Sequence, residues 1–163
     1  MSQSEASILA YVGLGANLGD AAATVLAAAK ELARTPGIQQ LRLSSLYETA
    51  PVDSSGPNYV NAVAEVHTSQ APLTLLGTLQ AIEQTHGRTR PYRNAPRTLD
   101  LDLLWYDGRS ITEPTLTVPH PRLHERAFVL QPLLELAGDL QLAQGSLTTL
   151  LARCADQAIH RLG

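Results

Sequence analysis

Two aspartates separated by one residue are the side chains of this sequence best suited to chemistry. Asp100 and Asp102 lie in a run, 96–106, in which apolar and polar residues alternate from Thr98 to Leu103. This period is typical of a half-buried β-strand. It predicts that both aspartates share one face while the leucines between them enter a core. Two carboxylates so close together favour a positive charge between them, and an all-oxygen pair suits Mg²⁺.

Arginines immediately before this strand supply the complementary charge. Four guanidinium groups occur within ten residues, at Arg88, Arg90, Arg93 and Arg97. Guanidinium is a planar fork that binds phosphate oxygens in pairs. Carboxylates for a metal beside arginines for an anion are the minimal set for chemistry on a nucleoside triphosphate. The arginine run favours this interpretation over the alternative of an exposed strand with two solvated aspartates.

The composition excludes several classes of protein. Of 163 residues, 44% are hydrophobic and 17% are charged, so we expect one globular domain over 1–163, with 1–5 frayed. The net charge of −3 gives no electrostatic footprint for nucleic acid. Lys30 is the only lysine, and the sequence contains no phosphate-binding loop of the G-x-x-x-x-G-K-[ST] type.

Cysteine usage and hydropathy indicate the compartment. Cys154 is the only cysteine, which excludes an internal disulfide, and its helical spacing from Leu150 and Leu151 indicates a buried position. The sequence shows no signal peptide and no apolar run near 18 residues. We therefore expect a cytoplasmic monomer that binds small molecules and has no membrane or nucleic-acid partner.

Hydrophobic periodicity predicts the elements that position these side chains. We expect strands over 8–12, 38–48, 59–66 and 98–103, helices over 20–32, 72–86, 132–138 and 146–160, and an irregular region over 111–122. A glycine turn, 13–19, joins the first strand to a helix capped by Asp20. The glycines of this turn have the spacing G-x-G-x-x-x-G, and no second strand that ends in an acidic ribose ligand follows them. We therefore do not expect a dinucleotide-binding fold. The order β-α-β-β-α-β predicts an α+β, ferredoxin-like antiparallel sheet with helices on one face and C-terminal helical additions.

Further candidate residues lie in two other segments. The loop 49–58 is rich in Pro, Ser and Gly, and loops of this length in small domains often bind ligands. After it, Tyr59 and Asn61 share a strand face and offer a ring for stacking and an amide. His120 lies between two prolines, and its simplest role there is that of a polar residue in a loop. Phe128, the only phenylalanine, is more typical of a core on sequence alone.

Ordered motifs cover the chain from Tyr11 to about Leu142. They are Gly13-Leu14-Gly15-Ala16-Asn17-Leu18-Gly19, Tyr59-Val60-Asn61-Ala62, Ile82-Glu83 with Gly87-Arg88, Pro96 through Asp102, and Leu116-Thr117-Val118-Pro119-His120 with Arg126 and Phe128. In this order they resemble the hydroxymethyl-dihydropterin pyrophosphokinase family of folate biosynthesis. The resemblance implies transfer of diphosphate from ATP to the hydroxymethyl group of 6-hydroxymethyl-7,8-dihydropterin, with release of AMP.

The resemblance also implies a role for each matching residue. Asp100 and Asp102 match the aspartates that hold two Mg²⁺ ions on ATP. The residues matching the nucleotide and phosphate ligands are Glu83, Arg88, Arg90, Arg97, His120 and Arg126, of which Arg88 and Arg97 also count as catalytic. Tyr59 and Phe128 match the aromatic pair that sandwiches the pterin. Asn61 and the backbone around Thr49 and Val52 match the groups that read the polar edge of the pterin.

The arginine loop departs from the family pattern, and two other functions stay open. Arg93-Asn94-Ala95-Pro96-Arg97 stands where a familiar form of the motif has Arg-Trp-Gly-Pro-Arg, and Pro121 replaces a familiar tyrosine, so a Trp-dependent lid is not carried over. One alternative is a non-catalytic domain that binds a nucleotide or metal for regulation. The other is an RNA-binding module with the same element order, which the 4% aromatic content and the acidic strand disfavour.

Overall fold

Six strands form one antiparallel sheet in the computed structural model, which describes residues 7–17, 19–49, 58–86 and 99–162. They are β1 (Ile8–Ala16), β2 (Ile38–Leu43), β3 (Leu46–Thr49), β4 (Tyr59–Thr68), β5 (Asp100–Tyr106) and β10 (His160–Leu162). β1 lies between β4 and β5, β2 and β3 both pair with the other edge of β4, and β10 pairs with β3. This arrangement confirms the predicted ferredoxin-like α+β fold.

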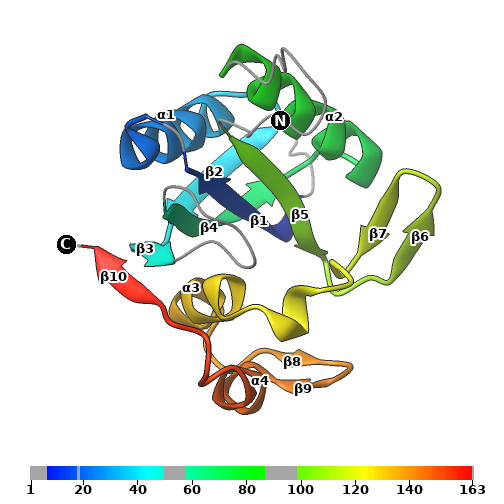
Figure 1. Cartoon of the computed structure of the whole chain (residues 1–163). Helices are drawn as coiled ribbons and strands as arrows, with labels where there is room; N and C mark the ends of the chain where they lie inside the picture. Colours follow the sequence, from blue (N-terminus) through cyan, green and yellow to red (C-terminus); the bar gives the residue numbers. More distant parts are fainter. Residues whose placement is uncertain (1–6, 18, 50–57, 87–98, 163) are drawn as a thin grey trace.

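Helices cover both faces of the sheet (Figure 1). α1 (Ala21–Ala33) and α2 (Pro72–Thr85) lie on one face, and α3 (Ala127–Ala137) and α4 (Leu147–Arg153) lie on the other. The remaining elements are the hairpin β6 (Ile111–Glu113) and β7 (Leu116–Val118), the 3-10 turn η1 (Leu123–Glu125), and the small hairpin β8 (Gln141–Leu142) and β9 (Gly145–Ser146). Among the helices that the structure describes, none is long and apolar enough to cross a membrane.

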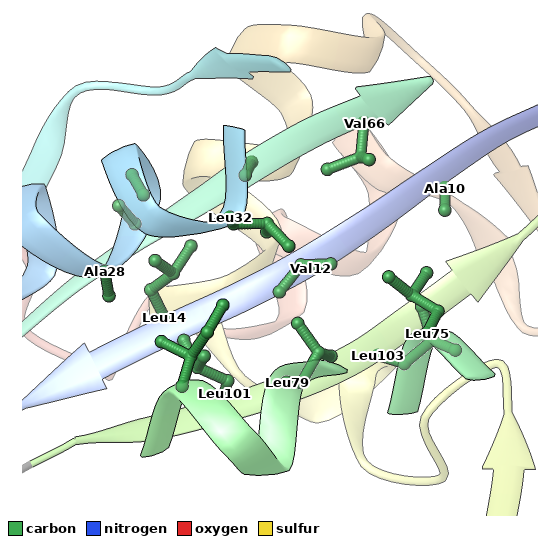
Figure 2. Close-up of a cluster of buried hydrophobic side chains, with 14 of the residues drawn as sticks. Ala10, Val12, Leu14, Ala28, Leu32, Val66, Leu75, Leu79, Leu101 and Leu103 are labelled. Carbon is green, nitrogen blue, oxygen red and sulfur yellow. The ribbon is translucent and has the colours of Figure 1, made fainter. Parts of the chain in front are cut away.

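The larger core lies between the sheet and the first two helices (Figure 2). Val12 of β1 packs there with Leu32 of α1 and Leu79 of α2. Leu101 and Leu103 of β5 enter the same core, as the alternating pattern predicts. Burial of each such side chain stabilises the fold by about 2 kcal/mol, so this core fixes which face of β5 carries the aspartates.

The second core lies between the opposite face of the sheet and the C-terminal helices. Tyr11, Val63 and Leu104 pack there, and Leu130 and Leu133 of α3 are fully buried against them. α3 thereby covers part of the sheet face that an RNA-binding module of this fold would use for stacking bases. The cover leaves the aspartate end of the sheet as the accessible part.

Hydrogen bonds to the carboxylate of Glu135 connect α3 to the strands on this side. Glu135 of α3 accepts hydrogen bonds from the Tyr47 hydroxyl (2.7 Å) and from the Ser45 backbone N–H (2.9 Å). Burial alone would raise the pKa of Glu135, but the hydrogen bonds from Tyr47 and Ser45 outweigh it and hold that pKa below its usual value. Burial and the bond to Glu135 raise the pKa of Tyr47 to about 12, so its hydroxyl keeps the donated proton.

The first strand is longer than the sequence pattern predicts. β1 continues to Ala16, so Gly13 and Gly15 lie inside the strand and the predicted turn over 13–19 is wrong. Both glycines pair with β4 on one side and β5 on the other, and these ladder hydrogen bonds extend the strand in spite of the low strand propensity of glycine. The helix after it begins as predicted, since the Asp20 carboxylate accepts a hydrogen bond from the Ala23 N–H.

The long strand expected over 38–48 is divided into β2 and β3. At the break, the Ser44 N–H donates to the Val63 carbonyl (2.9 Å) and the Ser44 hydroxyl accepts from the Val63 N–H (3.0 Å). The strand β4 matches its predicted alternation, with Val60 in the larger core and Val63 in the second. The division directs β3, rather than a continuation of β2, toward the start of β4.

The C-terminal third shows the largest differences from the sequence prediction. The expected irregular region 111–122 contains the β6–β7 hairpin. α3 begins at Ala127, five residues before Pro132, because this proline lies inside the helix rather than at its start. α4 begins after its cap Ser146 as predicted but ends at Arg153 instead of residue 160. Residues 160–162 instead form β10 and pair with β3.

Candidate active site

A cavity of about 710 Å³ opens on the sheet face that carries the two aspartates. Strands β4, β1 and β5 form one side of it, and η1, the start of α3 and the chain after α4 form the other. Its lining includes six residues that the sequence singles out, namely Tyr59, Asn61, Asp100, Asp102, Arg126 and Phe128. These residues are far apart in sequence, so the fold has brought them to one place.

A row across three neighbouring strands forms the floor of the cavity. Gly15 of β1 pairs with Asn61 of β4 on one side and with Asp100 of β5 on the other. Directly paired residues on neighbouring strands point to the same face. Because the central residue is glycine, the space between the amide and the carboxylate contains no side chain. Gly13 pairs with Asp102 and also lines the cavity, with the Leu104 side chain 3.4 Å from where a Cβ atom would lie.

The amide of Asn61 is held in a fixed orientation. The side chain is buried, with 7% of its surface exposed. The hydroxyl of Thr49, the last residue of β3, donates to Asn61 Oδ1 at 3.1 Å. On the other side, a Cβ atom at Gly15 would lie 2.8 Å from Asn61 Nδ2. The Thr49 bond therefore engages the amide oxygen, and the amide nitrogen lies against β1 at the cavity floor.

Charges of both signs meet beside the aspartates. Burial lowers the pKa of Arg126, and the charge of Asp102 opposes that effect. Burial likewise lowers the pKa of His120, the Asp102 charge raises it, and Arg126 and Arg122 lower it further. The guanidinium of Arg126 stays charged at neutral pH. A carboxylate and a guanidinium that line one cavity and interact electrostatically can bind a metal–anion pair.

The two aromatic rings line the cavity from opposite elements. Tyr59 begins β4, and Phe128 lies in the first turn of α3. The Arg126 guanidinium carbon lies 5.5 Å from the centroid of the Phe128 ring. This cation–π contact joins the charged and the aromatic parts of the α3 wall. A flat ring entering between Tyr59 and Phe128 would meet apolar faces there and the Asn61 amide at its edge.

The aspartate pair fits a magnesium site that is completed by the substrate. Among the described residues, no group of three or more His, Cys, Asp or Glu side chains could hold a metal ion. Asp100 and Asp102 both line the cavity and supply carboxylate oxygens there. Magnesium commonly binds through one or two carboxylates together with phosphate oxygens and water. The two carboxylates match this mode of magnesium binding, and they would not suit a structural zinc site.

Three of the other residues expected at the site, Thr49, Glu83 and His120, are described by the structure and are not part of the cavity lining. Thr49 supports Asn61 through its side chain. Glu83 of α2 is buried, and its Oε2 accepts a hydrogen bond from the Leu101 N–H at 2.8 Å, which ties α2 to β5. His120 donates its backbone N–H to the Leu104 carbonyl, and its Nδ1 accepts from the Arg122 N–H. Val52, Arg88, Arg90 and Arg97 lie outside the described residues.

Sequence reasoning missed several residues of the lining. Gly13 and Gly15 were assigned to a turn, although a glycine inside a strand can signal a close approach of another group. Glu125, Asp156 and Gln157 also line the cavity. No local pattern marks them, because they reach the site only through the packing of the C-terminal segment.

Comparison with known proteins gives one consistent result. The family model described as 7,8-dihydro-6-hydroxymethylpterin-pyrophosphokinase (HPPK) matches residues 11–138. The 2-amino-4-hydroxy-6-hydroxymethyldihydropteridine pyrophosphokinase of Pseudomonas aeruginosa is 44% identical over 154 residues, which cover 93% of this chain and 95% of that protein. The protein of the same name from Haemophilus influenzae is 40% identical over 157 residues, covering 95% and 98%.

A solved structure shows the same fold. The crystal structure of Plasmodium falciparum HPPK-DHPS matches with a TM-score of 0.73 at 16% identity, covering 93% of this chain and 46% of that chain. This chain thus spans less than half of that larger protein, and the likeness concerns the fold alone. The family model and the bacterial relatives, in contrast, extend over most of this sequence and confirm the resemblance seen in its ordered motifs. The chain belongs to the 7,8-dihydro-6-hydroxymethylpterin-pyrophosphokinase family.

Proposed function

We propose that this protein transfers diphosphate from ATP to the hydroxymethyl group of 6-hydroxymethyl-7,8-dihydropterin and releases AMP, as a step of folate biosynthesis. Membership of the family supports the reaction, since the bacterial relatives carry the name of this enzyme. The observation that carries the proposal for this chain is the single cavity that Asp100, Asp102, Arg126, Asn61 and the ring of Phe128 share.

The pterin end of the cavity is assigned to β4 and α3. The rings of Tyr59 and Phe128 offer stacking surfaces for a flat heterocycle, each aromatic pair adding about 1 kcal/mol beyond its buried area. Asn61 offers a buried amide at the edge of that space, and Thr49 holds its orientation. Buried polar groups of fixed direction discriminate strongly against rings that cannot pair with them. The backbone near Val52, outside the described residues, would complete the edge.

The phosphate end is assigned to β5 and the residue before α3. Asp100 and Asp102 would hold magnesium, two ions by the family resemblance, which when bound supplies neutralisation of the triphosphate charge. Arg126 presents a charged fork beside them, and one preorganised donor of this kind commonly lowers a barrier by about 3 kcal/mol. Binding to the same cavity brings the acceptor alcohol close to the phosphate chain, which reduces the entropy lost in reaching the transition state.

The remaining assignments rest on the resemblance. Glu83, His120, Arg88, Arg90 and Arg97 keep their proposed roles as nucleotide and phosphate ligands, the last three in a segment outside the described residues. Arg88 and Arg97 are proposed to stabilise charge on the bridging and leaving oxygens. A cytoplasmic monomer is the proposed state of the protein.

Product analysis tests the reaction. The purified protein is mixed with ATP, Mg²⁺ and the pterin alcohol, and nucleotides are separated by chromatography. We expect AMP and the pterin diphosphate in equal amounts, and no AMP when the pterin is omitted. ADP in place of AMP would show transfer of a single phosphate and contradict the proposal. Nucleotide binding without any turnover would favour the alternative of a non-catalytic domain that binds a nucleotide for regulation.

A further inference from the structure

The side-chain amide of Gln157 holds the peptide groups on both sides of Arg126. Its Oε1 accepts a hydrogen bond from the Ala127 N–H at 2.9 Å, and its Nε2 donates to the Glu125 carbonyl at 2.8 Å. The Glu125 carbonyl belongs to the peptide group before Arg126, and the Ala127 N–H belongs to the one after it. One side chain thus fixes the backbone direction from which the arginine extends.

The helix supports only part of this backbone, because the Arg126 carbonyl accepts from the Leu130 N–H while the Ala127 N–H has no acceptor inside the helix. Arg126 is the junction between η1 and α3, with extended dihedral angles of φ −119° and ψ 109°. As the N-cap of α3, it makes no side-chain capping bond. The first N–H groups of a helix have no partner inside the helix. The Ala127 N–H is the first of these groups, and Gln157 Oε1 gives it an acceptor.

Gln157 is exposed, and a backbone hydrogen bond ties it to the second core. Its backbone N–H donates to the Cys154 carbonyl at 2.9 Å, and Cys154 is buried, with 5% of its surface exposed. The end of α4 at Arg153 brings the chain to this position. All of these residues follow residue 138, where the match to the family model ends. The segment that braces the cavity wall is therefore outside the matched part of the chain.

We propose that Gln157 is a positioning residue for the reaction, which sets the direction of Arg126 and of Phe128 together. This inference rests on the proposed function. The guanidinium of Arg126 lies 5.5 Å from the Phe128 ring centroid. Arg126 and Phe128 are two residues apart, so both side chains depend on the same short backbone segment. A change in that segment would weaken pterin stacking and phosphate stabilisation at once.

Substitutions at Gln157 separate positioning from simple stability. Gln157→Met keeps the size of the side chain and removes both hydrogen bonds, so we expect kcat/KM for the pterin to fall about 10-fold. Gln157→Glu keeps an acceptor for the Ala127 N–H, and we expect it to recover part of that loss. The matched control is Ser146→Ala, which removes the hydrogen bond from the Thr149 N–H that caps α4 and leaves residues 125–127 untouched.

The control decides what a change in activity means. We expect Gln157→Met and Ser146→Ala to lower the Tm by similar amounts, while only the first raises the KM for the pterin and lowers kcat. In an Arg126→Ala background, Gln157→Met should have little further effect on kcat, because the group that it positions is gone. Equal kinetic losses in Ser146→Ala would show a merely structural role and overturn the inference.

The same experiment distinguishes the inference from the proposed function. A wild-type protein that releases no AMP would overturn both. An active wild type that is impaired by Arg126→Ala but unchanged by Gln157→Met would overturn the role of Gln157 alone. If Gln157→Met fails to fold, Gln157→Glu replaces it in the test, because it also lacks the Nε2 donor. Wild-type kinetics in Gln157→Glu, together with full loss of activity in Arg126→Ala, would also count against the role of Gln157.

Discussion

Substitution of Gly15 by alanine gives the sharpest test of the cavity floor. The new Cβ would lie 2.8 Å from Asn61 Nδ2, against at least 3.4 Å for an ordinary contact, so the amide must move by roughly 0.6 Å. Asn61 is buried and its oxygen accepts from Thr49, so it cannot move without weakening that bond. The next nearest atoms are the Val60 carbonyl oxygen at 3.9 Å and Asn61 Cγ at 4.0 Å, and no Asp100 atom is among them, so we expect Asp100 to keep its position.

The expected effect is a selective loss of pterin affinity. Misplacing one buried amide that pairs with the ligand costs about 1.5–3 kcal/mol, equivalent to a Kd about 10- to 100-fold higher. Alanine in a strand stabilises the fold by roughly 0.5–1 kcal/mol relative to glycine, which offsets part of the strain. We therefore expect a Tm close to that of the wild type and unchanged ATP binding.

Calorimetric titration with the pterin alcohol measures the change. The control is Gly13→Ala on the same strand, because its Cβ would contact the Leu104 side chain at an ordinary 3.4 Å, and we expect less than about a threefold change in Kd. In an Asn61→Ala background, Gly15→Ala should have almost no further effect. An unchanged Kd for Gly15→Ala in the presence of Asn61 would refute the reasoning that this amide reads the pterin.

Contacts elsewhere in the molecule lead to three more predictions. Asp102→Asn should lower kcat at saturating Mg²⁺ by more than about 100-fold and leave pterin Kd nearly unchanged; near-normal turnover would remove its metal role. Thr49→Val should raise pterin Kd about fivefold by releasing Asn61, and Thr49→Ser should restore it. Glu135→Gln should lower the free energy of unfolding in urea by about 1 kcal/mol at pH 7, since the carboxylate is largely exposed. Because the folded pKa of Glu135 lies below its ordinary 4.5, this contribution is complete above pH 4.5 and is lost as the pH falls through the folded value, so a difference that persisted at lower pH would contradict it.

The parts of the fold that depend on local pattern could be predicted from the sequence. Alternation over 98–103 placed Leu101 in the core and Asp102 on the opposite face, because a period of two admits only one burial pattern when one face is covered. The order of elements then led to the fold class. The resemblance of the motifs added the family and a set of site residues, six of which line one cavity.

The parts that depend on distant contacts could not be predicted. Whether Gly15 belongs to a turn or to a strand is decided by β4 and β5 on either side of it, which no local window includes. Residues 160–162, which helical periodicity assigns to the last helix, pair instead with β3, more than a hundred residues away in sequence. The contact between Gln157 and the backbone around Arg126 requires the observed end of α4 and the observed start of α3. The hydrophobic periodicity predicts both of these boundaries incorrectly.

The strand β10 has a practical consequence for handling the protein. Residues 160–162 pair with residues 46–48 of β3, and Thr49 follows directly, so the last strand adjoins the one whose end supports Asn61. Proteolytic trimming from residue 158 onward would strip that strand and leave Gln157 at a frayed end. An affinity tag or fusion partner joined after residue 162 would directly follow the same strand. Tags for the assays described above therefore belong before residue 7.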